Sequence, residues 1–185
     1  MSNRTKRDLE DALKRQLLKK PLGKITINEL SVDAGISRMT FYYHFRDIYE
    51  LAEWSCIEDA RKALAGKKTY STWTEGLMQI FEAVYENKPF IMNVYHSVDR
   101  ARIESFLGAL VSGLIGGVVR EKAEGKRITD EKQRFIAQFY TYSFIGVMLS
   151  WIDGGMMEDY AGIVEDVSLT MKGNIVNSIE NYSGI

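Results

Sequence analysis

The sequence is short of proline, cysteine and histidine, and each shortage excludes a class of protein. It has two prolines among 185 residues. All-β and loop-rich folds use proline as punctuation, so this scarcity favours long helices. The single cysteine, Cys56, excludes a disulfide framework within one chain and fits a reducing cytoplasm. With two histidines and no cysteine cluster, we expect neither a metal site nor a cofactor.

Long apolar runs are also scarce. Residues 105–119 form an uncharged run that is too short to span a bilayer. Residues 135–152 approach the required length, but polar side chains such as Gln138 and Ser150 predict a helix buried on several sides instead. The start of the chain is charged throughout and has no apolar signal segment. We therefore expect a cytoplasmic protein that has no membrane partner.

Helical periodicity runs along nearly the whole sequence, without strand alternation or an internal repeat. It predicts an all-α fold of about nine helices. Short N-terminal helices are separated near Gly66 from a longer helical bundle.

One N-terminal segment has the size and turn chemistry of a helix-turn-helix. Thr26 and Glu29 form a capping box at the start of the first helix. Gly35 tolerates the positive φ that a tight turn needs. Ser37 is placed to cap the second helix.

The second of these helices carries three consecutive aromatic residues, at positions 41–43. An αα-hairpin with all its aromatics in the core is the simpler alternative. One helix cannot turn three successive side chains toward one core, so at least one tyrosine is displayed. With Phe41 and Phe45 inward, the outward residues are Arg38, Met39, Tyr42 and Tyr43, with Thr40 and His44 at the margins. Such a mixture suits base edges and phosphates in a major groove.

The charge is divided unevenly along the chain. A net charge of −1 taken alone argues against a nucleic-acid partner. Residues 1–47, however, hold 10 Lys and Arg against 6 Asp and Glu, which gives +4, and the remainder carries −5. The basic excess lies where phosphates would bind.

Residues 25–54 resemble the DNA-binding segment of TetR/AcrR-type transcriptional regulators. The match rests on the turn Ala34-Gly-Ile-Ser37 and on the run Phe41-Tyr-Tyr-His-Phe45. The resemblance implies a helix-turn-helix DNA-binding domain of three helices at residues 1–47. It also implies a helical dimerisation and ligand-sensing domain at residues 48–185.

The resemblance also assigns residues to DNA. It gives Tyr42 and His44 to phosphates, and it places Arg38 and its neighbours opposite bases. The family commonly has a lysine where this chain has Ile48, and Arg46 is the expected substitute. The full predicted DNA-binding set is Thr26, Ser37, Arg38, Met39, Thr40, Tyr42, Tyr43, His44 and Arg46. A narrower similarity, in residues 40–49 and 95–100, is to the branch associated with dihydroxyacetone kinase operons.

The C-terminal region carries the expected dimer and effector sites. Residues 135–152 are apolar on more faces than one core covers, and small residues there allow close helix approach. The alternative is that these helices are interior to a monomer. The predicted interface is Tyr142, Ser143, Gly146, Ser150, Val167, Met171 and Ile175. The candidate ligand-binding residues for an unknown small-molecule effector are Trp73, Tyr85, Asn93, His96, Arg100 and Tyr140.

The sequence favours a regulator over an enzyme. It offers no nucleophile with a base, no metal cluster and no catalytic carboxylate pair. We expect a homodimer that binds a double-stranded, near-palindromic DNA operator and acts as a ligand-responsive repressor. The alternative is a co-regulator that works through a protein partner, with weak or no operator binding of its own.

Overall fold

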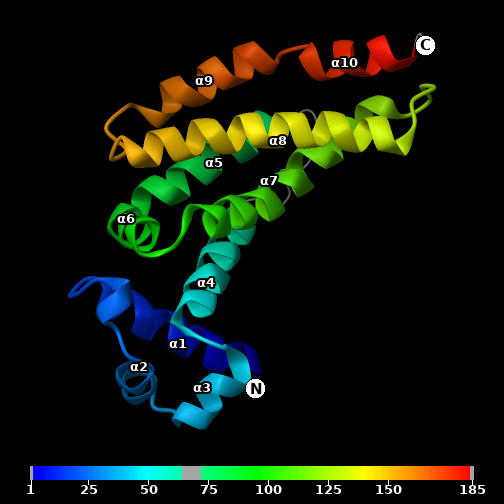
Figure 1. Ribbon diagram of the computed structural model, residues 1–185. Helices are drawn as coiled ribbons and strands as arrows, with labels where there is room; N and C mark the ends of the chain where they lie inside the picture. The colour runs from blue at the N-terminus through cyan, green and yellow to red at the C-terminus, as the bar shows by residue number, and fades with distance from the viewer. Residues whose placement is uncertain (1, 64–71, 184–185) are drawn as a thin grey trace. The chain divides into compact units, whose positions relative to one another are not determined.

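The computed structural model describes residues 2–63 and 72–183, and within these ranges the chain is helical without strands (Figure 1). The elements are α1 (Ser2–Leu17), η1 (Leu22–Lys24), α2 (Ile27–Asp33), α3 (Arg38–His44), α4 (Ile48–Ala63), α5 (Trp73–Glu86), α6 (Lys88–Ser97), α7 (Arg100–Ala123), α8 (Asp130–Asp153), α9 (Tyr160–Met171) and α10 (Asn174–Ser183). The expected all-α fold is confirmed. The segment expected to be one C-terminal helix is divided into α9 and α10 at Gly173, which has φ +78°. The boundary expected near Gly66 lies outside the described residues.

The chain packs as two compact units. The first comprises Met1–Asp59 and Asn87–Ile103, and the second comprises Ala60–Glu86 and Glu104–Ile185. The first unit therefore holds α1 to α3, most of α4, all of α6 and the first residues of α7. By packing, the first unit therefore includes residues after Asp47, where the sequence predicts that the DNA-binding domain ends. That domain boundary concerns function and stays a prediction.

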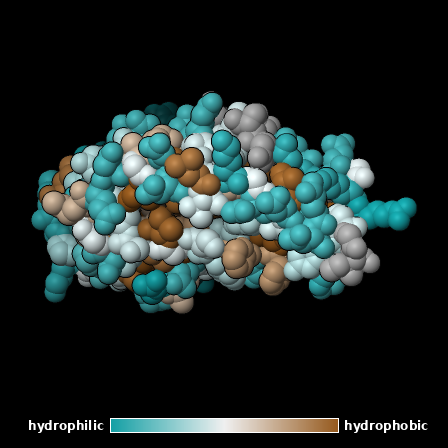
Figure 2. Space-filling view, turned by 90° about the horizontal axis from the view of Figure 1, so that it is seen from above, coloured by the Kyte–Doolittle hydropathy of each residue, from teal (hydrophilic) through white to brown (hydrophobic). Residues whose placement is uncertain are grey.

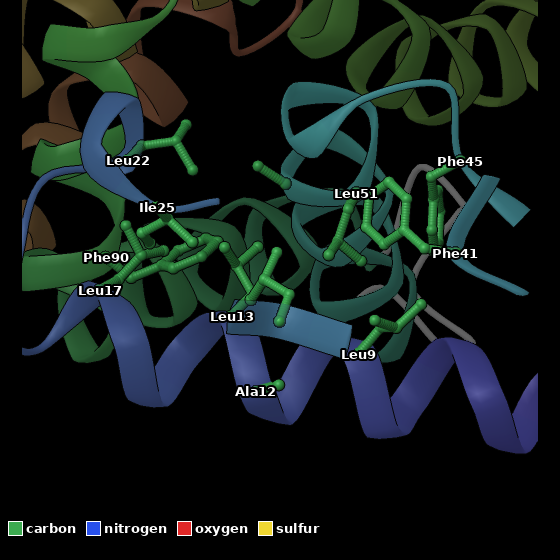
Figure 3. Close-up of a cluster of buried hydrophobic side chains, with 12 residues drawn as sticks. Leu9, Ala12, Leu13, Leu17, Leu22, Ile25, Phe41, Phe45, Leu51 and Phe90 are labelled. Atoms are coloured by element: carbon green, nitrogen blue, oxygen red, sulfur yellow. The ribbon is translucent and has the colours of Figure 1, made fainter. Parts of the chain in front are cut away.

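The core of the first unit fixes the position of α3. Phe41 of α3 is completely buried, in one cluster with Leu9 and Leu13 of α1 (Figure 3). Burying one such aromatic side chain contributes about 2 kcal/mol. Phe90 of α6 packs into the same cluster, so residues far along the chain complete the core beneath the helix-turn-helix.

Asn93 of α6 binds the end of α1 through its side-chain amide. Its Oδ1 accepts a hydrogen bond of 2.9 Å from the backbone N–H of Leu22. Its Nδ2 donates to the carbonyl oxygens of Leu17, at 3.3 Å, and Lys20, at 3.4 Å. Leu17 is the last residue of α1, whose final carbonyls have no partner within the helix, and Lys20 lies in the connection that follows. Asn93 thus holds α6 against the α1–η1 connection.

A second polar contact joins α1 to α4. The Lys14 ammonium donates to Glu10 at 2.8 Å and to Asp59 at 2.7 Å. Ser55 of α4 also donates to the buried Glu10 carboxylate, at 3.1 Å. Every charge in this cluster has a partner, which a buried carboxylate requires.

The second unit is organised around α8. Its inward face includes Phe144 and Trp151, which pack on Phe81 of α5 with ring centroids 5.8 and 5.0 Å away. The Trp151 indole donates to the carbonyl of Glu158 at 3.0 Å. α5 also packs on α9, and α10 packs on α8. One face of α8 is therefore committed to the core.

By length and composition, α7 and α8 are apolar enough to cross a membrane. Residues 105–119, expected to be too short to do so, form part of the 24-residue α7. In α8, half of the most apolar window is buried within the protein, and in α7 38% of it is. Core helices of soluble proteins pass the same test, and we interpret both helices in that way.

Candidate nucleic-acid interface

The first helix of the helix-turn-helix begins at the predicted capping box. The Thr26 hydroxyl accepts from the Glu29 N–H at 3.2 Å, and the Thr26 N–H donates to the Glu29 carboxylate at 2.9 Å. Lys20 adds a hydrogen bond of 2.6 Å to the same carboxylate. This bond from Lys20, followed by those from Thr26, lowers the pKa of Glu29 to about 2. The start of α2 is thereby fixed.

The turn follows its predicted chemistry. Gly35 has φ +66°, which a residue with a Cβ rarely adopts. Ile36 is half-buried against the core, and its N–H donates to the carbonyl of Ser31 at 2.9 Å. The Ser37 hydroxyl accepts from the Thr40 N–H at 3.0 Å and so caps α3. Together these contacts set the angle at which α3 leaves the turn.

α3 has one buried and one exposed face. Phe41 and the residue that ends the helix, Phe45, are buried, with ring centroids 6.0 Å apart. On the outer face, Met39 is 83% exposed, Tyr43 82% and Tyr42 52%. All nine residues predicted to contact DNA are exposed or half-buried: Thr26, Ser37, Arg38, Met39, Thr40, Tyr42, Tyr43, His44 and Arg46.

His44 is half-buried at the end of α3. Burial, with the nearby positive charge of Lys6, lowers the pKa of His44 below its usual value. The neutral imidazole that results at pH 7 has one N–H to donate. Lys6 lies over the rings of Phe45, at 5.1 Å, and Trp54, at 5.4 Å. Lys6 was not among the predicted residues, because nothing in local spacing places the start of α1 beside the end of α3.

The connection from α3 to α4 directs Arg46 outward. Asp47 caps α4 by accepting from the Glu50 N–H at 2.8 Å. The Arg46 N–H donates to the Glu50 carboxylate at 2.6 Å, and the Arg46 side chain is 76% exposed. Ile48, which replaces the family's lysine, packs against the core. It supplies packing rather than a charge for phosphate.

The residues predicted for a dimer interface divide into exposed and buried ones. On α8, Tyr142, Ser143, Gly146 and Ser150 are exposed. They line an open groove of about 440 Å³, together with Val147, Trp151, Glu158 and Ile163. The face over α8, α9 and α10 shows apolar patches among hydrophilic side chains (Figure 2). On α9 and α10, Val167 is half-buried, whereas Met171 and Ile175 are buried within the unit.

The candidate ligand residues are divided equally between the two units. Trp73, Tyr85 and Tyr140 belong to the second unit, and Asn93, His96 and Arg100 to the first. The Tyr140 hydroxyl lies 3.3 Å from that of Ser178. Asn93 uses its amide on the backbone of α1 and η1, and His96 is exposed.

The only cysteine of the chain and the candidate metal ligands were considered as possible catalytic groups. Burial raises the pKa of the Cys56 thiol to about 12, so Cys56 is not an activated thiolate. Among the described residues, no three His, Cys, Asp or Glu side chains gather closely enough to hold a metal ion.

The chain was compared with known families and solved structures. Residues 71–173 match a TetR family model described as a transcriptional regulator C-terminal region. No curated protein matches the sequence. The solved structure of the dihydroxyacetone kinase operon activator DhaS is similar, with a TM-score of 0.69 and 18% identity over 97% of this chain and 98% of that one.

Two further solved structures share the fold. A TetR-family regulator from Streptomyces coelicolor has a TM-score of 0.60 and 14% identity, over 96% of this chain and 89% of that one. NalD of Pseudomonas aeruginosa, described as the secondary repressor of the MexAB-OprM multidrug efflux pump, has a TM-score of 0.58 and 15% identity, over 92% of this chain and 96% of that one.

Proposed function

Because the chain belongs to the TetR family of transcriptional regulators, we propose that it is a ligand-responsive repressor that binds a near-palindromic operator as a homodimer. It is a DNA-binding regulator that works in the cytoplasm. The observation that carries the proposal is the outer face of α3, where Met39, Tyr42 and Tyr43 stand exposed on a helix anchored from beneath.

The phosphate contacts belong at the edges of this face. Tyr42 offers a hydroxyl, His44 a neutral imidazole and Arg46 a guanidinium, and each of these groups donates to phosphate oxygens. Their side chains are exposed or half-buried. They position the helix on the duplex and carry no base preference of their own.

Dimerisation uses the exposed groove on α8. Two copies of the chain meet through the same surface, the groove around Gly146, and so form a self-complementary contact. Two α3 helices then read half-sites about 34–36 Å apart. A small-molecule effector binds the helical bundle and changes the separation of the two helices, which weakens operator binding.

The effector site involves His96 and Arg100, which suit an anionic or carbonyl-bearing molecule. The similarity to the branch associated with dihydroxyacetone kinase operons rests on residues 40–49 and 95–100. The similarity of this chain's fold to that of DhaS supports the assignment of the chain to this branch.

A second candidate function has one specific observation in its favour. Ile48 packs against the core where the family commonly presents a lysine. A chain that lacks this phosphate contact is suited to act as a co-regulator through a protein partner, with little operator affinity of its own.

Salt dependence separates the two candidates. Fluorescence anisotropy with labelled promoter fragments is measured from low to high salt. For operator binding, log K falls with log salt with a slope of about −0.9 per neutralised phosphate. Tyr42→Ala lowers affinity about equally for all sequences, whereas Leu18→Ala, at a residue 78% exposed and outside the predicted set, does not. The absence of binding at any salt would support the co-regulator instead.

A further inference from the structure

Two large side chains on the outer face of α3 are almost fully exposed. Met39 and Tyr43 are 83% and 82% exposed, which makes them the most exposed large apolar residues of this helix. They are four residues apart, so they lie one above the other on one side of the helix. Exposed apolar side chains grouped in this way mark a surface that meets another molecule.

Few polar groups on α3 compete with them for base edges. The hydroxyls of Ser37 and Thr40 lie 2.8 Å apart and bond each other, and the Ser37 hydroxyl also accepts from the Thr40 N–H. α3 has no Asn or Gln, the usual readers of adenine, and no Asp or Glu, which accept from cytosine. Arg38 is the charged donor of its outer face.

The Tyr43 ring has an aromatic neighbour. It meets the His44 ring edge to face, with centroids 5.0 Å apart. A ring oriented before binding loses less conformational freedom when it packs on a ligand. Met39 is unbranched and adapts its shape to the group that it contacts.

We propose that Met39 and Tyr43 contact the 5-methyl groups of thymines in the major groove, so that thymine is read by apolar contact within each half-site. The thymine methyl is the apolar group on the major-groove edge of the four bases. Arg38 then supplies the contact to guanine. This inference rests on the proposed operator binding and names the feature of the operator that α3 recognises.

Deoxyuridine tests the inference, because it lacks the 5-methyl group of thymidine and pairs in the same way. The full-length protein selects its sites from randomised duplexes, and each conserved thymine is then replaced singly by uracil. Uracil at one or two positions in each half-site weakens binding by the wild-type protein about four-fold, the value expected for losing one buried methyl group. Met39→Ala or Tyr43→Ala removes this sensitivity at the matching position. The thymine·adenine pair at that position is also replaced with cytosine·guanine. Methylation of this cytosine at C5 then gives tighter binding than the unmethylated cytosine.

Two variants serve as controls. Arg38→Ala lies on the same surface and loses affinity, but it keeps the sensitivity to uracil. Leu18→Ala, an exposed apolar residue of the same unit, retains both affinity and sensitivity. Unchanged thermal melting confirms that each variant folds.

The inference is overturned if uracil at every thymine leaves wild-type affinity unchanged, if the selected sites hold no conserved thymine, or if Met39→Ala and Tyr43→Ala lose as much affinity to uracil as the wild type. In those cases operator binding itself still stands. If no duplex is bound in a sequence-specific manner, the proposed function and this inference both fail.

Discussion

The guanidinium of Arg102 donates two hydrogen bonds to the carboxylate of Glu53, one from Nε and one from a terminal nitrogen at 3.2 Å. Arg102 lies near the start of α7 and Glu53 on α4, and the pair belongs to the first unit. The guanidinium also lies 5.9 Å from the centre of the Tyr49 ring and 4.0 Å from Asp47. Because Asp47 caps α4 directly after α3, this pair also supports the connection that follows α3.

We expect the Arg102–Glu53 pair to contribute to the stability of the first unit. Arg102→Gln lowers the free energy of unfolding by about 1–2 kcal/mol, since bonds between charged groups are strong and this pair is only partly exposed. Urea unfolding of Arg102→Gln, Glu53→Gln and the double variant gives the coupling energy. A coupling of about 0.5 kcal/mol or more is expected. Strictly additive losses would show that the pair does not act as a unit.

The capping box makes the first unit sensitive to acid. The pKa of Glu29 is lowered to about 2 in the folded protein. Ionised Glu29 therefore stabilises the fold at pH values above its unfolded pKa of about 4.3, and this contribution is lost as the pH falls toward 2. The melting temperature of the wild type is expected to exceed that of Glu29→Gln at pH 6, and this difference is expected to be smaller at pH 3. Glu165→Gln, at an exposed position on α9, serves as the control. A difference that stays constant with pH contradicts the assignment.

A Cβ at Gly35 strains the turn. Its φ of +66° lies in the left-handed region, and no other group lies within 4 Å of the added carbon. Gly35→Ala therefore costs about 1 kcal/mol from backbone conformation alone. Gly113 is exposed within α7 and equally uncrowded, and there the same substitution stabilises by about 0.5–1 kcal/mol. Urea unfolding gives the change in the free energy of unfolding for each variant. Changes of the same sign in the two variants would contradict the conformational argument.

An arginine at Gly146 separates the proposed dimer. Gly146 is exposed, and nothing lies within 4 Å of a Cβ added there, so each copy still folds. Two arginines brought together in a self-complementary contact repel each other and lose hydration. Gly146→Arg is expected to sediment as a monomer and to bind the operator weakly, whereas Ser112→Arg, at an exposed position of α7, stays dimeric. A dimeric Gly146→Arg would place the interface elsewhere.

Local sequence signals predicted the helix-turn-helix well, because its determinants lie three or four residues apart. The Thr26–Glu29 capping box, the Ser37 cap and the positive φ of Gly35 all depend on neighbours in the chain. The exposed face of α3 followed from the inward placement of Phe41 and Phe45.

Contacts between distant segments were beyond such signals. Asn93 was expected at a ligand, yet its amide binds backbone more than 70 residues earlier in the chain. The Arg102–Glu53 pair and the placement of Lys6 over Phe45 also depend on tertiary packing. In each of these contacts the two partners lie far apart in the sequence, so local spacing could not predict it.

The contact between Asn93 and the end of α1 limits how this protein can be recombined with its relatives. The first unit is assembled from two stretches of chain, with α5 encoded between them. A hybrid that takes only residues 1–59 loses the Asn93 amide that bonds the carbonyls of Leu17 and Lys20, and it loses Phe90 from the core. We therefore expect such a hybrid to keep this unit intact only if residues 87–103 are transferred together with the N-terminal helices.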